Sequence, residues 1–429
     1  MRALVSTEQE RRTERVFLVG VELKARQGLC IRDSLSELAE LVSTAGGKVV
    51  GEGVQRLERP VAATYLGKGK AEEFAERCRL EGVDTVVFDD ELTPAQSRNL
   101  ERVFACKVLD RTDLILDIFA QRARTREGKL QVELARLGHL LPRLTRYWSH
   151  LSRQKGGIGM RGGEGESQLE SDRRKVQERI DRLKVELGEV RRQRTTQRQG
   201  RQRSQWPLAS LVGYTNAGKT TLFNALTGAE SLEEDKLFAT LDPMTRRLRL
   251  PTNQNILLSD TVGFIRKLPH GLVEAFKATL EEVVNADLLL HVVDVSHDQA
   301  EIQVEAVHAV LEEIGAAEKP VLLVLNKVDR LGSGVGIPFW TGRFPGAVAV
   351  SARTREGFPG LLAELGCRLR PVRDFVEVEV PHRESAAMAR LRALGQVVEE
   401  AYDGDVARFK VRLPPHARIE FAPFIVRDL

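Results

Sequence analysis

Residues 208–226 read LASLVGYTNAGKTTLFNAL. An apolar strand is predicted over 208–212, a loop of the pattern G-x-x-x-x-G-K-T follows over 213–220, and an amphipathic helix begins at 221. A loop of this spacing between a strand and a helix cradles phosphates with its backbone N–H groups and the helix N-terminus. The stretch therefore predicts an α/β fold, a P-loop domain with a mostly parallel sheet and helices on both faces.

The predicted phosphate-binding residues are consecutive. They are Gly213, Tyr214, Thr215, Asn216, Ala217, Gly218, Lys219, Thr220 and Thr221. In this loop Lys219 should reach the β- and γ-phosphates, and the hydroxyl of Thr220 should ligate Mg²⁺. The loop alone does not distinguish ATP from GTP, so the choice of base has to come from elsewhere in the chain.

A second motif selects the base. Asn326-Lys327-Val328-Asp329 follows an apolar strand predicted over 321–325. The Asp329 carboxylate can accept hydrogen bonds from the ring N–H and the exocyclic amine of guanine, whereas adenine offers no such pair of donors. A further short motif follows a strand predicted over 347–350, where a main-chain N–H would back the same base. The predicted guanine-binding residues are Asn326, Lys327, Asp329, Ser351, Ala352 and Arg353.

Two segments have the positions of nucleotide switches. Asp260, Thr261, Val262 and Gly263 follow a strand predicted over 256–258, so that Asp260 can hold Mg²⁺ through water and the Gly263 N–H can sense the γ-phosphate. The earlier segment consists of Phe238, Ala239, Thr240 and Leu241. Thr240 is the candidate that closes on Mg²⁺ and the γ-phosphate, the alternative being a surface threonine in a turn.

The residue after Gly263 bears on the rate of hydrolysis. Phe264 stands where Ras-like proteins carry the glutamine that orients the attacking water, so we expect slow hydrolysis without a partner. One hypothesis is that Asn216 helps to hold K⁺ near the β/γ bridge, where its charge would stabilise the transition state. His291 lies in an apolar strand predicted over 288–293, and we interpret it as core packing.

The N-terminal part divides into a tail over 1–14 and a small α/β domain over 15–111. Short β-branched runs alternate there with helical stretches, which predicts a parallel sheet with crossover helices. The predicted strands cover 16–21, 48–54, 85–88 and 107–109, and the predicted helices 34–45, 70–81 and 94–104. The segment Gly67-Lys68-Gly69-Lys70 is too short for a P-loop, so a strand-to-helix turn is favoured over a nucleotide site.

Residues 112–204 predict a long antiparallel helical hairpin. Leucines step by three and four residues from Leu130 to Leu151, and a second apolar seam runs from Leu169 to Val190. Pro142 should kink or restart the first helix. Between the seams, residues 152–167 are rich in glycine and basic side chains, which suits contact with RNA phosphates, the alternative being an unordered connection. The RNA-contact candidates are Arg153, Lys155, Gly156, Gly157, Gly159 and Arg161.

The composition limits the class of protein. Of 429 residues, 42% are apolar and 29% charged, and the net charge of +4 conceals a basic stretch over 171–203 with twelve Lys/Arg and five Asp/Glu. No apolar run is long enough to span a membrane, and the N-terminus has no leader-like pattern, so a cytoplasmic protein is expected. Four scattered cysteines predict isolated buried thiols, not a zinc site or disulfides.

The remaining sequence divides into the GTPase domain over 205–370 and a small α+β domain over 371–429. In the latter, the predicted strands cover 375–380, 397–402 and 407–413, and a helix covers 385–394. No catalytic constellation is apparent in this last domain.

Taken together, the chain resembles the HflX-type GTPases of the translation-factor-related class. The residues that carry the resemblance are Asp90-Glu91-Leu92-Thr93-Pro94-Ala95-Gln96, the 111–124 stretch, Gly156-Gly157-Ile158-Gly159, Gln168-Leu169-Glu170, Asp172-Arg173-Arg174, the 238–243 stretch, and 260–264 continuing to Leu268-Pro269-His270. The sequence departs from the family pattern at Met160 and at Gly163-Glu164-Gly165.

The resemblance implies a cytoplasmic GTPase, monomeric by default, that binds GTP, GDP and Mg²⁺. It further implies binding to the rRNA of the large ribosomal subunit and the splitting or rescue of stalled ribosomes under stress. Two other classes stay open from the residues. One is an ATP-driven RNA remodeller that uses 67–70, and the other is a GTP-gated scaffold that binds a protein through the heptad faces.

Overall fold

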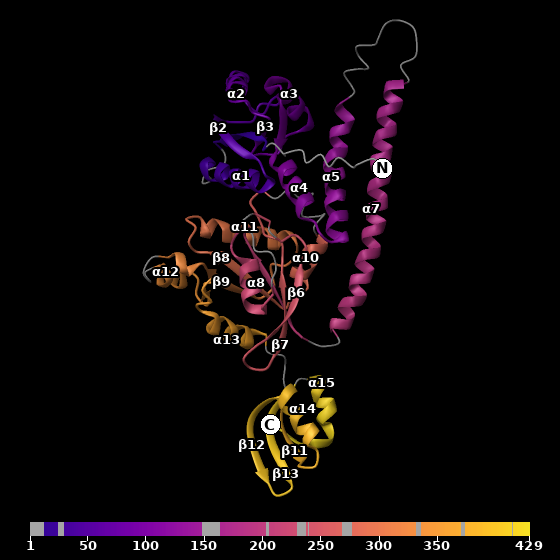
Figure 1. The fold of residues 1–429 in the computed structure, drawn as a ribbon, viewed down its shortest axis with the longest axis vertical. Helices are drawn as coiled ribbons and strands as arrows, with labels where there is room; N and C mark the ends of the chain where they lie inside the picture. Colours follow the sequence, from indigo (N-terminus) through magenta and orange to yellow (C-terminus); the bar gives the residue numbers. More distant parts are fainter. Residues whose placement is uncertain are drawn as a thin grey trace, which may run out of the picture. The chain divides into compact units, whose positions relative to one another are not determined.

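The computed structural model describes residues 13–24, 30–147, 164–202, 206–229, 237–238, 240–267, 277–331, 336–369, 374–413 and 415–429. Contacts divide the chain into two compact units, drawn in Figure 1. The first unit comprises 1–190 together with the separate segments 235–241 and 267–276. The second comprises 191–234, 242–266 and 277–429. The two inserted segments of the first unit contain or adjoin both predicted switches.

The first unit is built on a four-stranded parallel sheet. Its strands are β1 (Arg15–Leu23), β2 (Lys48–Leu57), β3 (Thr85–Phe88) and β4 (Lys107–Asp110), in the order β2-β1-β3-β4. All three pairings are parallel, which confirms the predicted parallel sheet with crossovers.

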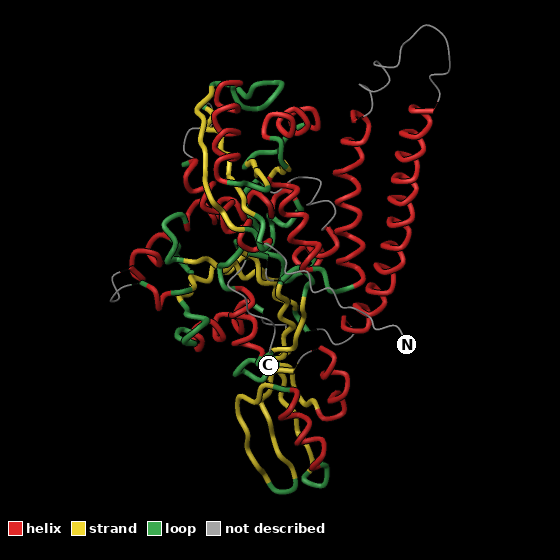
Figure 2. Tube along the Cα trace, turned by 45° about the horizontal axis from the view of Figure 1, so that its top comes forward, coloured by secondary structure: helices red, strands yellow, loops and turns green. Residues whose placement is uncertain are grey.

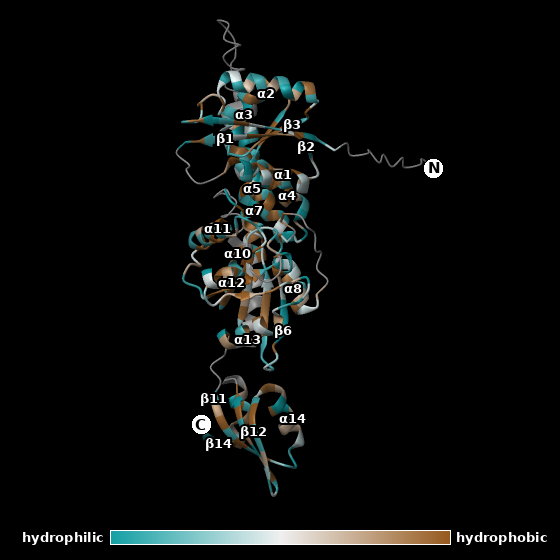
Figure 3. Ribbon diagram, turned by 90° about the vertical axis from the view of Figure 1, so that its left-hand side faces the viewer, coloured by the Kyte–Doolittle hydropathy of each residue, from teal (hydrophilic) through white to brown (hydrophobic). Residues whose placement is uncertain are grey.

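Helices cover both faces of this sheet, as Figure 3 shows from the side. The helices α2 (Lys68–Glu81) and α3 (Pro94–Phe104) lie on one face, and α1 (Ile31–Ala45) and α4 (Arg111–Arg122) on the other. The prediction placed residues 112–122 in the hairpin arm. Helix α4 instead packs on α1 and buries its apolar residues, so the N-terminal domain extends to about Arg122.

The predicted helical hairpin is present, and its residues up to Val190 belong to the first unit. Helices α5 (Arg126–Tyr147) and α7 (Glu164–Gln202) run side by side in Figures 1 and 2. They are antiparallel, because Glu133 pairs with Arg179 at 2.8 Å while Arg126 pairs with Glu186 at 3.8 Å. Leucines of both seams form one apolar cluster: Leu130, Leu134, Leu137, Leu183 and Leu187, with Val190.

The arm differs from the prediction in three details. Helix α5 is one continuous element through Pro142, without a restart. Helix α7 begins at Glu164, so the last four residues of the predicted 152–167 loop are helical; one glycine inside a helix costs only about 1 kcal/mol. The same helix continues beyond Val190 to Gln202. The six RNA-contact candidates, Arg153 to Arg161, lie outside the described residues.

The second unit contains the predicted P-loop sheet. Its strands are β5 (Leu208–Gly213), β6 (Met244–Arg249), β7 (Asn255–Asp260), β8 (Leu288–Asp294), β9 (Val321–Asn326) and β10 (Val348–Ala349), in the order β10-β9-β8-β5-β7-β6. Only β6, at the edge, pairs antiparallel among these strands. The central strands appear as apolar ribbons in Figure 3. The mostly parallel sheet is therefore confirmed.

Helices pack on both faces of this second sheet. Apolar residues of α8 (Lys219–Thr227) and α13 (Phe358–Arg368) join one core cluster with the strands on one face. On the other face lie α10 (Lys277–Val284), α11 (Ala300–Glu313) and α12 (Gly336–Arg343), with the short helix η1 (Val328–Arg330) after β9.

The C-terminal residues form a separate α+β domain with its own core. Strands β11 (Asp374–Pro381), β12 (Gln396–Asp403), β13 (Val406–Leu413) and β14 (Ile425–Asp428) make an antiparallel sheet in the order β12-β13-β11-β14. Helices α14 (Ser385–Leu394) and α15 (Pro415–Phe421) cover one face, visible in Figure 1, and η3 (Ala422–Phe424) precedes β14. The sequence prediction lacked α15 and β14.

Candidate nucleotide-binding site

The predicted phosphate loop connects the end of β5 to the start of α8. Two of its glycines have positive φ angles, +149° at Gly213 and +91° at Gly218. A Cβ atom would lie 2.3 Å from the Val292 carbonyl oxygen at the first position and 2.3 Å from Asn326 Nδ2 at the second. Only glycine fits both places, because the loop backbone approaches β8 and the predicted base-binding motif this closely.

Lys219 is the buried cation of the loop. Its Nζ donates hydrogen bonds to the carbonyl oxygens of Gly213 at 3.1 Å and Tyr214 at 2.7 Å. Burial lowers the pKa of Lys219 to about 8, and the charge of Lys327 lowers it further while that of Asp260 raises it. A phosphate placed in the loop would favour the charged form and offer the ammonium group stronger acceptors than these carbonyls.

Two oxygen-bearing side chains meet beside the loop. Thr220, on the first turn of α8, donates its hydroxyl to Asp260 Oδ2 at 2.8 Å. Asp260 ends β7 and is fully buried, and the Thr261 hydroxyl fixes this strand end by donating to the Leu211 carbonyl at 2.5 Å. A hydroxyl and a carboxylate are the oxygen donors that Mg²⁺ prefers, so the two predicted ligands fit that ion.

The second predicted switch lies directly on the phosphate loop. The N–H of Phe264 donates to the Gly213 carbonyl at 3.0 Å, and the N–H of Thr215 donates to the Phe264 carbonyl at 2.7 Å. Gly263 passes so close that a Cβ there would lie 2.9 Å from Thr215 Cα. The Phe264 side chain is buried, and a phenyl ring has no polar group that could orient a water molecule.

Asn326 joins the phosphate loop to the predicted base-binding loops. Its Nδ2 donates to the Ala217 carbonyl at 2.8 Å, and its Oδ1 accepts from the N–H of Ala352 at 2.9 Å. Lys327 makes a parallel connection, with its Nζ 2.8 Å from the Asn216 carbonyl and 2.6 Å from Asp294 Oδ2. Asp294 ends β8, and no sequence motif marks it as part of the site.

The side chain predicted to bind guanine is held in position. Ser351 donates its hydroxyl to Asp329 Oδ1 at 2.6 Å and accepts from the N–H of Thr354 at 3.1 Å. Arg353 is exposed. The structure therefore brings together predicted residues from four segments: 213–220, 260–263, 326–329 and 351–352. Phe238, Thr240 and Leu241 belong to the first unit, and Ala239 lies outside the described residues.

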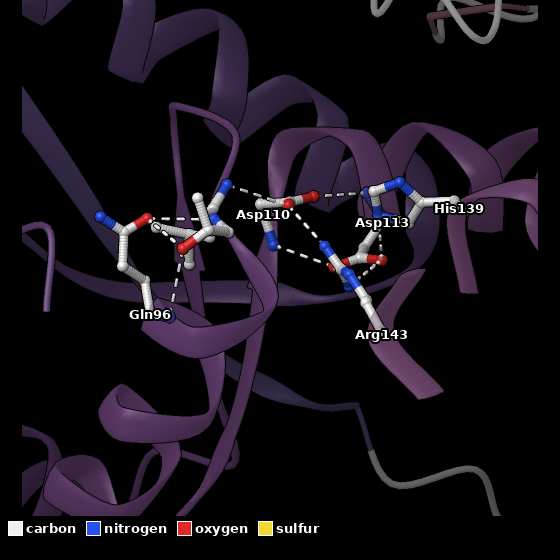
Figure 4. Close-up of polar contacts among 7 residues, drawn as sticks. Gln96, Asp110, Asp113, His139 and Arg143 are labelled. Atoms are coloured by element: carbon white, nitrogen blue, oxygen red, sulfur yellow. Dashed lines mark hydrogen bonds and ion pairs between the residues drawn. The ribbon is translucent and has the colours of Figure 1, made fainter. Parts of the chain in front are cut away.

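A cluster in the first unit has ligand atoms spaced for a metal ion. One atom each from Asp110, Asp113 and His139 lies within 4.8 Å of the others. Figure 4 shows that Arg143 contacts both carboxylates. Its guanidinium group donates hydrogen bonds to Asp113 at 2.7 Å and to Asp110 at 2.8 Å. With this cation in place the cluster is an ion-pair network that ties α5 to the start of α4.

The glycine-lysine segment is a strand-to-helix turn, as favoured by the sequence, but the helix begins earlier than predicted: Gly67 precedes α2 and residues 68–70 form its first turn. The N–H of Gly67, the residue before the helix, donates to Gln55 Oε1 at 2.9 Å, and Lys70 pairs with Glu73 at 2.7 Å. The Gly67 N–H and the Lys70 ammonium group, which could otherwise bind a phosphate, thus have partners within the domain.

His291 is confirmed as a core residue. It is fully buried, with its ring centroid 5.5 Å from that of His308, and neither ring nitrogen has a hydrogen-bond partner among the described residues. Burial lowers its pKa to about 3, with a further contribution from His308 and Lys219.

No disulfide links the four cysteines, and the predicted burial is wrong for two of them. Cys78 is buried, whereas Cys30 and Cys367 are exposed because they lie next to or near a helix end, outside the core clusters. Among the helices within the described residues, none combines the length and hydropathy of a membrane span.

Three family models match successive parts of the chain. They are described as GTP-binding GTPase N-terminal over residues 32–120, GTP-binding GTPase Middle Region over 122–201, and 50S ribosome-binding GTPase over 209–327. The first two meet at residue 121, in the last turn of α4, close to the end of the N-terminal domain in the structure.

Full-length relatives are similar to the chain. GTPase HflX of Magnetococcus marinus is 49% identical over 400 residues, covering 93% of this chain and 92% of that protein. GTPase HflX of Escherichia coli is 48% identical over 386 residues, covering 89% and 90%. A crystal structure of a GTP-binding protein from the archaeon Sulfolobus solfataricus in complex with GDP is 25% identical, covers 83% of this chain and 99% of that one, and has a TM-score of 0.43.

Proposed function

The chain belongs to the HflX family of GTPases, and on that premise we propose that it binds and hydrolyses GTP and associates with ribosomes, chiefly through the large subunit. One observation carries the proposal. Asn326 bonds both the phosphate loop and the loop that contains Ser351, while Ser351 orients the Asp329 carboxylate. Phosphate recognition and base recognition are thereby joined in one hydrogen-bonded unit.

Each residue then has a role that its position allows. The N–H groups of the phosphate loop and Lys219 bind the β- and γ-phosphates, and Asp329 accepts from guanine. Thr220 and Asp260 would hold Mg²⁺, and Thr240 would join them when the first switch closes. When bound there, Mg²⁺ would supply positive charge to offset the charge on the transferred phosphoryl oxygens. The N–H of Gly263 senses the γ-phosphate.

Hydrolysis depends on a partner in this account. The buried Phe264 cannot orient water, so the intrinsic rate should be low. We expect purified large ribosomal subunits to raise the rate of GTP hydrolysis at least tenfold, measured as phosphate release. Lys219→Ala should remove the stimulated rate. A rate that subunits leave unchanged would exclude the ribosome as the activating partner and favour the scaffold alternative.

A potassium ion is the proposed further cofactor. Asn216 has a left-handed backbone conformation, with φ of +59°, and lies in the phosphate loop opposite Lys327. Its side-chain oxygen would help to hold K⁺ beside the β/γ bridge, replacing the charge of an arginine finger. Turnover in K⁺ should exceed turnover in Na⁺ several-fold, and Asn216→Ala should remove the difference. Equal rates in the two salts would refute the potassium site.

The arm supplies the proposed ribosome contact. Residues Arg153 to Arg161, which lie between α5 and α7 in the sequence, would contact the RNA of the large subunit, and this would separate the subunits of stalled ribosomes under stress. The site of action would be the cytoplasm, where ribosomes work. Replacing Arg153, Lys155 and Arg161 by alanine should abolish subunit splitting, followed by light scattering, while GTP affinity stays at the wild-type value.

A further inference from the structure

We propose that the N-terminal domain is a dock for both switch segments, and that helix α4 connects this dock to the arm. The inference rests on the proposed function in one respect, namely that 238–241 and 260–267 change conformation with the γ-phosphate. All the contacts that support the inference lie within the first unit. The segments 235–241 and 267–276 belong to this unit, although in the sequence they lie within the GTPase domain.

The first switch docks through an aromatic side chain. The ring of Phe238 lies edge-on to that of Phe119 on α4, with centroids 4.6 Å apart and an interplanar angle of 77°. Phe238 is only 2% exposed, and the neighbouring Leu237 donates its N–H to the Thr44 hydroxyl at 3.3 Å. Thr240, the proposed Mg²⁺ ligand, is two residues further along the chain.

The second switch docks through a charge. Lys267, four residues after Gly263, pairs through its Nζ with Asp89 and with Asp90, the latter at 2.8 Å. Asp89 is buried and also accepts from Ser34 at 2.7 Å and from Arg111 at 2.8 Å. If Lys267 left this site, the adjacent carboxylates of Asp89 and Asp90 would lose a compensating positive charge. Electrostatic attraction therefore favours the docked position of Lys267.

Both docking residues have an unfavourable backbone. Phe238 and Lys267 each have a φ angle of +54°, a conformation that bulky L-residues rarely adopt. Such strain persists only where surrounding contacts impose it, and it is common in segments that change conformation. The two segments are therefore held in the dock against a local cost, which their release would recover.

Helix α4 contacts every part of this arrangement. Its first residue, Arg111, pairs with Asp89 beneath Lys267, and Phe119 contacts Phe238. On the arm side, Asp113 accepts from Arg143 of α5, and Asp117 pairs with Arg136 of α5 at 3.0 Å. One rigid helix thus connects both switch segments with the base of the arm.

The dock should oppose the GTP state. In the second unit of the described structure, Gly263 packs on the phosphate loop and Lys219 donates to loop carbonyls, whereas a γ-phosphate would draw both groups to itself. Moving Gly263 and Thr240 onto the γ-phosphate pulls on Lys267 and Phe238. GTP therefore releases the dock, and a weakened dock should favour GTP over GDP.

The affinities for a fluorescent non-hydrolysable GTP analogue and for fluorescent GDP test this in the full-length chain. Phe119→Leu and Asp90→Asn each weaken one half of the dock without touching the proposed nucleotide site. We expect each to raise the affinity for the analogue relative to GDP at least about threefold, as expected for the loss of one aromatic or charged contact. The controls are Phe339→Leu, an exposed phenylalanine on α12, and Lys48→Met, an exposed lysine on β2. Ratios that stay within the controls' range for both dock variants would overturn the proposal.

Hydrogen exchange separates this result from the proposed function. In nucleotide-free protein, the amides of 237–238, 240–241 and 267, the described residues of the two segments, should exchange faster in Phe119→Leu and Asp90→Asn than in the wild type, whether or not the chain binds guanine nucleotides. Adding the analogue should raise exchange in α5 of the wild type, and this response should be reduced in both variants. Unchanged protection of the two segments in both variants would refute the dock, and an unresponsive α5 would refute its link to the arm.

Discussion

At the residue scale, Asp329 carries the choice of base. It stands after β9 with one carboxylate oxygen fixed by Ser351, so the other is available to the N–H groups of a guanine. Asp329→Asn replaces an acceptor by an amide donor, which opposes the guanine amine but can pair with the carbonyl oxygen that xanthine has at that position. We predict a loss of GTP affinity of about 100-fold or more, with a gain for XTP.

Equilibrium titration with labelled GTP and XTP measures the exchange of specificity. Ser351→Ala is the matched control, because it removes the orienting bond but keeps the carboxylate, so it should weaken GTP binding without admitting XTP. An Asp329→Asn chain that still prefers GTP would show that another group reads the base.

His291 makes stability depend on pH. Burial lowers its pKa from the ordinary 6.5 to about 3, so below pH 6.5 the unfolded chain binds a proton that the folded chain excludes. Stability is therefore retained above pH 6.5 and lost as pH falls from 6.5 towards 3, by up to about 1.4 kcal/mol per pH unit. His291→Leu removes this dependence.

Thermal melting of the two proteins between pH 7.5 and 5 tests the prediction. The melting temperature of the wild type should fall relative to that of His291→Leu as the pH decreases through 6.5. His297→Leu, which changes a histidine outside the core on the loop after β8, should track the wild type. A constant difference between wild type and His291→Leu would mean that His291 is not the titrating group.

Sequence motifs predicted the site residues that lie close together in the sequence. The phosphate loop and the Asn326–Asp329 motif each place their groups within one turn of chain, so spacing alone marks them. Asp294, which holds Lys327, and Phe119, which receives Phe238, have no such signature. Their partners are far away in the sequence, and only the tertiary fold brings them together.

At the scale of elements, the joint between α4 and α5 is the point where the arm is fixed. Asp110 caps α4 and is buried, and it shares Arg143 with Asp113. Burial and the charge of Asp113 raise the pKa of Asp110 to about 6, even though Arg143 opposes the rise. Arg143→Met leaves these carboxylates without their cation, and we predict that the free energy of opening α5 falls by about 2 kcal/mol.

Hydrogen exchange of the α5 amides measures that opening. Arg136→Met is the control, because its pair with Asp117 has side chains 52% and 37% exposed and should contribute at most about 1 kcal/mol. Equal effects of the two substitutions would contradict a special role for the buried joint.

Periodicity predicted long elements better than short ones. The apolar seams of α5 and α7 repeat over several turns, so their pairing could be expected from the sequence. The sequence prediction places α4 in the arm, because the packing on α1 that puts it in the N-terminal domain is a long-range contact that no local pattern shows. The helix α15 and strand β14 are only seven and four residues long, too short for a period to emerge.

At the scale of the whole molecule, the division into two units gives the nucleotide a means of acting at a distance. The sheet that carries the phosphate loop belongs to the second unit, while both segments next to the γ-phosphate sensors belong to the first unit with the arm. The parallel sheets of the first two domains and the arm hairpin could be predicted from the sequence. This division could not, because the segments 235–241 and 267–276 interrupt a region whose motifs otherwise read as one domain.

The central claim is that the γ-phosphate controls binding to the large ribosomal subunit. Co-sedimentation of the chain with purified large subunits tests it most directly, in a non-hydrolysable GTP analogue, in GDP and without nucleotide, with Lys219→Ala alongside. We expect at least tenfold more wild-type protein in the subunit pellet with the analogue than with GDP, and no such difference for Lys219→Ala. Equal sedimentation of the wild type in all three states would contradict it.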